Sequence, residues 1–236
     1  MTDDDDGLLG LPVIPVLLSA IAGSLDVIGL LELGLFTAHL TGNLALLVAQ
    51  AVRRGDAPVA PLLAVPVFVA ALAVTRMLVS GLRSLGLGML RPLLLVELLL
   101  LAGCLAVRVT ARPSPDPNAA STVLAGMLGV TAMGVQNVLV SLREEPPTTV
   151  MTSNVTRLAQ DVGEILLGPE TTGEDRARRR ARQTWPVVAG FVVGCGLGAA
   201  CLVVIGPWSL ALPAGLTLLA LASNWRKRLL RATVYA

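Results

Sequence analysis

Long apolar stretches alternate with short polar ones along this chain of 236 residues. A helix that crosses a lipid bilayer needs ~20 consecutive, mostly apolar residues. The pattern therefore predicts an all-α, polytopic transmembrane helix bundle, in which residues 1–236 form a single membrane domain. It contains eight hydrophobic segments, at about 9–33, 36–52, 59–82, 90–109, 119–142, 148–167, 184–205 and 208–224.

The second and sixth segments are weaker than the others because polar residues interrupt them. If both cross the bilayer, the chain has eight spans. If both are re-entrant or lie at the membrane interface, it has six. Cytoplasmic segments carry an excess of Lys and Arg, and with eight spans Arg53, Arg112, the arginine-rich loop 169–183 and the basic tail share one side. Six spans fit the arginines almost as well. Eight is favoured, and both counts place the two termini in the cytoplasm.

The two halves of the chain resemble each other when residues 22–45 are placed over 133–156, at an offset of 111. Because polar residues are rare in apolar helices, their agreement carries the comparison. We predict two repeats, at about 8–110 and 119–224. Four crossings per repeat would make the halves parallel and three would make them inverted, and both designs occur in secondary transporters. The matched pairs are Gly23 with Gly134, Asp26 with Asn137, Thr37 with Thr148, Thr41 with Thr152 and Asn43 with Asn154.

Composition supports lipid as the solvent of this chain. Hydrophobic residues make up 54% and charged residues 14%, with a mean hydropathy of +0.76, whereas soluble domains carry roughly 25% charged residues. Arginines that cluster in loops do not indicate a nucleic-acid partner. The N-terminal aspartates lack the basic character of a signal peptide. We expect an integral membrane protein, with the lipid bilayer as its partner.

Polar side chains inside the apolar segments are the candidate functional residues. A charged group at the bilayer centre costs ~2.5–3.5 kcal/mol on insertion scales, so such groups usually face a cavity or a partner. His39, Asn43 and Gln50 share one helical stripe, and a second stripe runs from Asn154 to Glu164. The candidate substrate- or ion-binding residues are Asp26, His39, Thr41, Asn43, Gln136, Asn137, Thr152, Asn154, Arg157 and Asp161.

Each of these residues also has a structural interpretation. Asn, Gln and Thr tie membrane helices together through hydrogen bonds worth ~0.6 kcal/mol on average. Asp26 either pairs with a cation or stays protonated, and with His39, the only histidine of the chain, it has the groups needed to carry a proton. Arg157 and Asp161 are spaced to neutralise each other on one helix.

Signatures of enzymes and metal sites are absent from the sequence. It contains no Walker, HExxH or GxSxG motif, and one histidine does not build a typical metal site. We therefore expect no catalytic residue, no metal and no cofactor. Gly190, Gly194 and Gly198 form two overlapping GxxxG steps, typical of close helix packing within a chain or between copies, so a homo-oligomer stays open.

Short motifs recur in the same order as in a known group of proteins. The first half contains Gly23-Ser24-Leu25-Asp26 and then Phe36 followed by Thr41-Gly42-Asn43. The second half contains Gly134-Val135-Gln136-Asn137 and then Thr148 to Ser153. This order resembles the YoaK-like family of uncharacterised bacterial membrane proteins (domain of unknown function 1275), with Ser153 at a position usually held by glycine. The resemblance implies a polytopic protein of the bacterial inner (plasma) membrane and supplies no substrate.

Two hypotheses for function follow from the sequence. The first is a small permease-like secondary transporter, with a polar midplane site between two repeats that binds an unknown small molecule or ion. The second is a non-transporting scaffold or accessory subunit that binds a cytoplasmic partner through the arginine-rich loop. A water-accessible cavity between the halves that reaches Asp26 and Asn137 would favour transport, and a solid, fully bonded interface would favour the scaffold.

Overall fold

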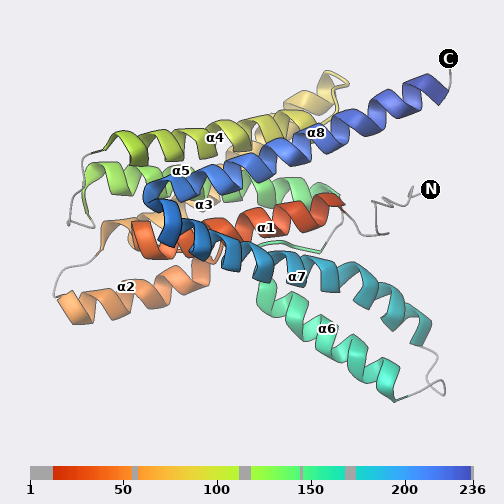
Figure 1. Cartoon of the computed structure of the whole chain (residues 1–236), viewed down its shortest axis with the longest axis horizontal. Helices are drawn as coiled ribbons and strands as arrows, with labels where there is room; N and C mark the ends of the chain where they lie inside the picture. The colour runs from red at the N-terminus through yellow and green to blue at the C-terminus, as the bar shows by residue number, and fades with distance from the viewer. Residues whose placement is uncertain (1–12, 55–57, 112–117, 144–145, 168–173, 235–236) are drawn as a thin grey trace.

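The computed structural model describes residues 13–54, 58–111, 118–143, 146–167 and 174–234 (Figure 1). Every regular element among them is helical, which confirms the predicted all-α class. The elements are α1 (Val13–Ile28), the π-helical turn η1 (Gly29–Leu33), α2 (Leu40–Arg54), α3 (Val59–Ser84), α4 (Leu90–Thr110), α5 (Ala120–Leu142), α6 (Met151–Leu166), α7 (Glu174–Ile205), the 3-10 turn η2 (Gly206–Leu210) and α8 (Ala211–Val234).

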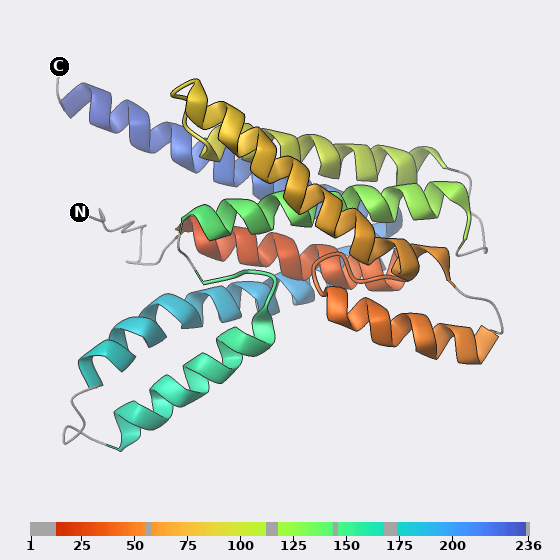
Figure 2. The ribbon, with the colours of Figure 1, turned by 180° about the vertical axis from the view of Figure 1, so that it is seen from behind.

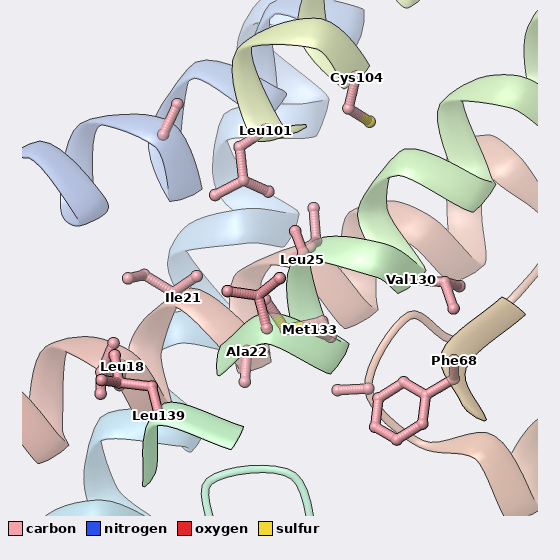
Figure 3. Close-up of a cluster of buried hydrophobic side chains, with 14 of the residues drawn as sticks. Leu18, Ile21, Ala22, Leu25, Phe68, Leu101, Cys104, Val130, Met133 and Leu139 are labelled. Atoms are coloured by element: carbon pink, nitrogen blue, oxygen red, sulfur yellow. The ribbon is translucent and has the colours of Figure 1, made fainter. Parts of the chain in front are cut away.

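Helices α1 and α5 form the centre of the bundle. Of their most apolar windows, 72% and 67% of the residues are buried, against 28% or less for α3, α4 and the α7–α8 segment. Figure 3 shows Leu18 and Leu25 of α1 in one cluster with Met133 and Leu139 of α5, joined by Leu101 of α4. The outer helices therefore expose apolar surface, as expected of helices that face lipid.

Five segments are long and apolar enough to cross a membrane. They are Val13–Leu33, Val59–Ser84, Leu90–Thr110, Ala120–Leu142 and Asp175–Ser223. The last of these contains both α7 and α8, with η2 between them. Helices α2 and α6 have 15 and 16 residues. At 1.5 Å per residue they are about 23 Å long, which is short of the ~30 Å hydrocarbon core. The eight crossing helices that we favoured are therefore not confirmed.

The helices α2 and α6 each follow a stretch of extended chain. After η1 the chain turns back through residues 34–39 before α2 begins, and after α5 residues 146–150 lead into α6. Figures 1 and 2 show α6 and the first turns of α7 splayed away from the rest of the bundle. They also show that α1 begins and α8 ends at the same end of the molecule.

Glycines bring α1 and α7 into backbone contact. A Cβ added to Gly190, Gly194 or Gly198 would lie 2.8, 2.3 or 2.8 Å from a backbone oxygen of α1. A Cβ on Gly23 of α1 would lie 2.3 Å from the backbone oxygen of Phe191. The GxxxG face is therefore occupied within the chain.

Helix α7 begins earlier than the sequence indicated. The arginine-rich stretch was expected to be a loop ending near residue 183, but from Glu174 onward it is helical and continuous with the membrane-spanning part. Contact with α6 along this stretch explains the extension, because packing against a neighbour stabilises a helix beyond its apolar core. The remaining part of that predicted loop, 169–173, lies outside the described residues.

Substituting Gly194 with Ala should destabilise the protein, because the added Cβ would press on the Ala20 backbone, which cannot move away as a flexible side chain would. Overpacking of this kind costs about 1–3 kcal/mol. Gly196→Ala is the matched control, since nothing lies within 4 Å of its Cβ position. We expect a melting temperature several degrees lower for Gly194→Ala in detergent and no loss for Gly196→Ala. Equal melting temperatures would contradict the close α1–α7 contact.

Candidate functional site

Asp26 is the centre of a buried polar cluster at the end of α1. The residue is 3% exposed. Its Oδ1 accepts hydrogen bonds from the backbone N–H of Thr37 at 2.8 Å, the backbone N–H of Ala38 at 2.7 Å and the Thr37 hydroxyl at 3.1 Å. Its Oδ2 is hydrogen-bonded to Nδ1 of His39. One carboxylate therefore holds the extended segment 34–39 against α1.

His39 connects this buried carboxylate to the outside. Its side chain is 28% exposed, and its ring lies edge-on to Phe36 and to Phe191, at centroid distances of 6.3 and 5.4 Å. The aromatic rings fix the imidazole, and Asp26 accepts a hydrogen bond from Nδ1 of His39 when that nitrogen carries a proton. The pair thus contains a carboxylate and an imidazole, two groups that can each bind and release a proton, which is what a proton carrier requires.

A pair of asparagines secures the two extended segments in similar ways. Asn43 of α2 accepts the Phe36 N–H at 2.7 Å and donates to the Phe36 oxygen at 2.6 Å. Asn154 of α6 donates to the Pro147 oxygen at 2.6 Å. Because proline has no N–H, the second pairing lacks its return bond, and Oδ1 of Asn154 is buried without a partner.

Amides and hydroxyls replace the carboxylate in the second half. Gln136 of α5 donates to the Leu18 oxygen at 2.9 Å and to the Thr148 hydroxyl at 2.8 Å. Asn137 donates to the Thr149 hydroxyl at 2.6 Å. The segment 146–150 is therefore bonded to α5, and through Gln136 also to α1.

A pocket of about 200 Å³ lies beside this second cluster. Arg76 of α3 stands next to it, with its guanidinium donating to the Ser141 hydroxyl at 2.8 Å. The pocket is lined by Asn137, Val140, Ser141, Pro147, Thr148 and Thr149. It reaches Asn137, as the transport hypothesis requires, but Asp26 is not among its lining residues. The pocket offers amide and hydroxyl groups for a small polar molecule, with a cation at its margin.

Four candidate residues lie away from these clusters. Thr41, Thr152 and Arg157 are exposed. Asp161 is buried at 2% exposure, but it pairs with Arg180 of α7 at 2.6 Å rather than with Arg157. Arg180 also reaches Glu164 at 3.1 Å. Arg180 was not predicted as this partner, because the sequence indicates a loop at 169–183, whereas the helical α7 lies beside α6 from Glu174 onward.

Other polar groups of the bundle were not assigned from the sequence. Arg108 of α4 bonds to Glu32 of η1 at 2.7 Å, which neutralises two charges within the bundle. Glu97 of α4 is fully buried, and neither carboxylate oxygen has a hydrogen-bond partner. Among the described residues no group of three or more His, Cys, Asp or Glu side chains is placed to hold a metal ion.

Apolar helices around buried polar loops define a polytopic α-helical membrane protein. The chain belongs to the family described as proteins of unknown function, DUF1275, whose model matches residues 14–223. This match confirms the resemblance carried by the short motifs, and it covers both polar clusters. No curated protein and no solved structure matches the chain.

Replacing Asp26 separates its role as an acceptor from its charge. Asp26→Leu would leave the N–H groups of Thr37 and Ala38 buried without an acceptor, at about 1–3 kcal/mol each. Asp26→Asn keeps one oxygen in place for both. We expect a large drop in melting temperature for Asp26→Leu and a much smaller one for Asp26→Asn, measured in the same detergent. Equal losses would show that the charge shared with His39, and not the acceptor, holds the segment.

Proposed function

We propose that this chain is a small permease-like secondary transporter whose substrate site lies beside the extended segment 146–150. The observation that carries the proposal is a pair of non-helical segments held inside a bundle of apolar helices by polar side chains. At membrane depth such backbone is tolerated only where it is buried in protein or lines a cavity. Interrupted helices of this kind form the substrate sites of many secondary transporters.

Equivalent contacts support an internal duplication. The bonds from Asp26 to Thr37 and from Asn43 to Phe36 have counterparts, at an offset of 111 or 112, in Asn137 with Thr149 and Asn154 with Pro147. The contacts between helices show the same correspondence, in which α1, α2, α3 and α4 match α5, α6, α7 and α8 in order. The contact of α1 with α7 then corresponds to the contact of α5 with α3. Likewise α4 with α5 becomes α8 with α1, and α2 with α3 becomes α6 with α7.

The path of the chain favours six crossings and inverted halves. Helix α1 ends at η1, and segment 34–39 then turns back into the bundle. Helix α2 runs from there toward the same end as α1, so α1 and α2 together make one net crossing (Figure 1). The same holds for α5 and α6. The first half then starts at one end of the bundle and finishes at the other, and the second half runs in reverse, as in transporters with inverted repeats.

The positions of the arginines along the helices are consistent with this six-crossing path. Arg83, Arg91 and Arg143 lie at helix ends on the side where α1 begins, together with the arginines of α7 (Figures 1 and 2). Arg53 lies at the opposite end. With six crossings the positive-inside rule supports a cytoplasmic side for both termini, as it also does with eight, so the arginines do not separate the two span counts.

Cysteine labelling distinguishes the two span counts. In a variant without Cys104, Cys195 and Cys201, Ser84→Cys and Arg53→Cys report on opposite ends of α3. Six crossings place position 84 in the cytoplasm and position 53 outside, and eight crossings reverse both. We therefore expect a membrane-impermeant maleimide to label Arg53→Cys, and not Ser84→Cys, on intact cells, with both labelled after lysis. The reverse pattern would restore the eight-span topology.

The pocket favours a substrate smaller than a typical drug molecule, since binding sites for those occupy ~300–1,000 Å³ and this one about 200 Å³. Its Asn, Ser and Thr groups suit a solute with several hydrogen-bonding atoms. The nearby Arg76 favours a solute that carries a negative charge. In this proposal Asp26 and His39 carry the coupling proton, and they fix the first extended segment while they do so.

One observation favours the alternative of a non-transporting scaffold. Both oxygens of Asp26 are already bonded within the protein, which matches a residue that serves only to hold the fold. In that case the pocket at Asn137 would bind nothing, and the arginines of α7 would dock a cytoplasmic partner.

Ligand screening by thermal shift on the detergent-purified chain tests the site and the class together. We expect at least one small polar metabolite to raise the melting temperature of the parent protein. Asn137→Leu and Thr149→Val should abolish that shift, because each removes a hydrogen-bonding group that lines the pocket. Thr131→Val is the control, since its hydroxyl bonds the Met127 oxygen of its own helix.

For hits that pass this test, uptake into proteoliposomes that depends on a pH gradient supports a coupled transporter. Stabilisation with equal strength in all three variants would place the ligand elsewhere, and a ligand that binds without any uptake would favour the scaffold.

A further inference from the structure

A groove of about 310 Å³ runs between α6 and the first turns of α7. Its α6 wall consists of Leu158, Val162 and Ile165, which lie at i, i+4 and i+7 on one face. Its α7 wall consists of Arg178, Ala181, Arg182 and Trp185, again on one helical face. The groove thus combines an apolar interior with two guanidinium groups.

Ion pairs hold these two walls together without using the groove. Arg180 bonds Asp161 and Glu164, so α6 is fixed against α7. Arg180 does not line the groove, while Arg178 and Arg182, two residues away on either side, do. The ion pairs of Arg180 therefore lie outside the groove, and Arg178 and Arg182 contribute to its α7 wall.

The length of α7 sets the depth of the groove in the membrane. At 1.5 Å per residue its 32 residues extend ~48 Å, whereas residues 185–205 alone extend ~31 Å, which matches the hydrocarbon core. Trp185, which is 45% exposed, stands at the boundary where tryptophans are enriched. The turns that carry Arg178 and Arg182 then lie at the level of the lipid headgroups.

We propose that this groove binds one anionic glycerophospholipid, with its phosphate on Arg178 and Arg182 and an acyl chain along Leu158 and Trp185. Guanidinium groups bind phosphate oxygens through paired hydrogen bonds. Apolar walls add nothing to the binding of inorganic phosphate but do favour a chain of CH₂ groups. The site is separate from the pocket at Asn137, so it does not depend on transport.

Fluorescence of Trp185 tests the proposal directly. Trp208→Phe and Trp225→Phe leave Trp185 as the only tryptophan of the full chain. Detergent-purified protein is titrated with phosphatidylglycerol or with phosphatidylcholine, each brominated on its acyl chains. We expect the phosphatidylglycerol to quench Trp185 at a concentration at least tenfold lower, while millimolar inorganic phosphate leaves the curve unchanged.

Charge-matched variants show whether the groove or the general basic surface is responsible. Arg178→Gln with Arg182→Gln should remove most of the preference, at about fivefold per arginine. Arg176→Gln with Arg179→Gln removes the same charge from exposed residues of α7 outside the groove and should keep the preference. Arg182→Gln alone, with about a fivefold loss, serves if the double variant does not fold.

Three results would overturn the proposal. Equal quenching by both lipids would mean that the groove does not select an anionic headgroup. Equal losses in the two double variants would mean that only the overall basic charge attracts the lipid. Competition by inorganic phosphate would mean that Arg178 and Arg182 form a site for free anions rather than for lipid.

Discussion

Segment 34–39 leaves the helical hydrogen-bonding pattern inside a bundle of apolar helices, where the backbone has to find every partner within the protein. Thr37 and Leu35 are completely buried there. Asp26 meets this requirement by accepting two backbone N–H groups and one hydroxyl on a single oxygen. The buried charge costs free energy by itself, and His39 offsets that cost as its ionic partner. The position of α2 and the ring contacts with α7 follow from this one carboxylate.

In the second half, neutral side chains hold the non-helical segment 146–150 in place, and the buried amide oxygen of Asn154 is left without a partner. Asn137 and Gln136 bond the hydroxyls of Thr149 and Thr148, so no charge has to be compensated there. Pro147 provides no N–H to Asn154, and an amide oxygen is left without a partner. The cluster around Asp26 thus leaves no buried side-chain atom of Asp26, Thr37 or Asn43 without a partner, while the cluster of the second half is less completely satisfied and has a pocket beside it. Duplication followed by divergence would give one half that is suited to hold a proton and another that is suited to hold a solute.

Apolar segments and the motif residues could be predicted from the sequence because lipid imposes simple rules on helix length and polarity. The sequence indicates Asp26 and His39 together as carriers of a proton, with a cation partner or protonation of Asp26 left open, and the structure shows that their side chains are hydrogen-bonded. Helical stripes, however, show which residues share a face and not what that face meets. Thr41 and Thr152 belong to the repeated motifs and are nevertheless exposed, as is Arg157, which shares a stripe with the buried Asn154. Asp161 found its partner on another helix. The number of crossings depends on backbone that reverses direction between helices, and hydropathy carries no information about direction.

The glycine contacts between α1 and α7 carry a mechanical consequence. They bind a helix of the first half to one of the second, and α5 is joined to α3 in the same way. Each helix makes its most extensive contact within one of two bodies that are not the sequence halves: α1, α6, α7 and α8 in one, and α2, α3, α4 and α5 in the other. The two bodies meet where α4 packs against α8 and in the shared core of α1 and α5. The chain passes between these bodies at two places, between α1 and α2 and between α5 and α6. Relative motion of the bodies would have to be absorbed there, so the two polar extended segments would act as the hinges of the molecule.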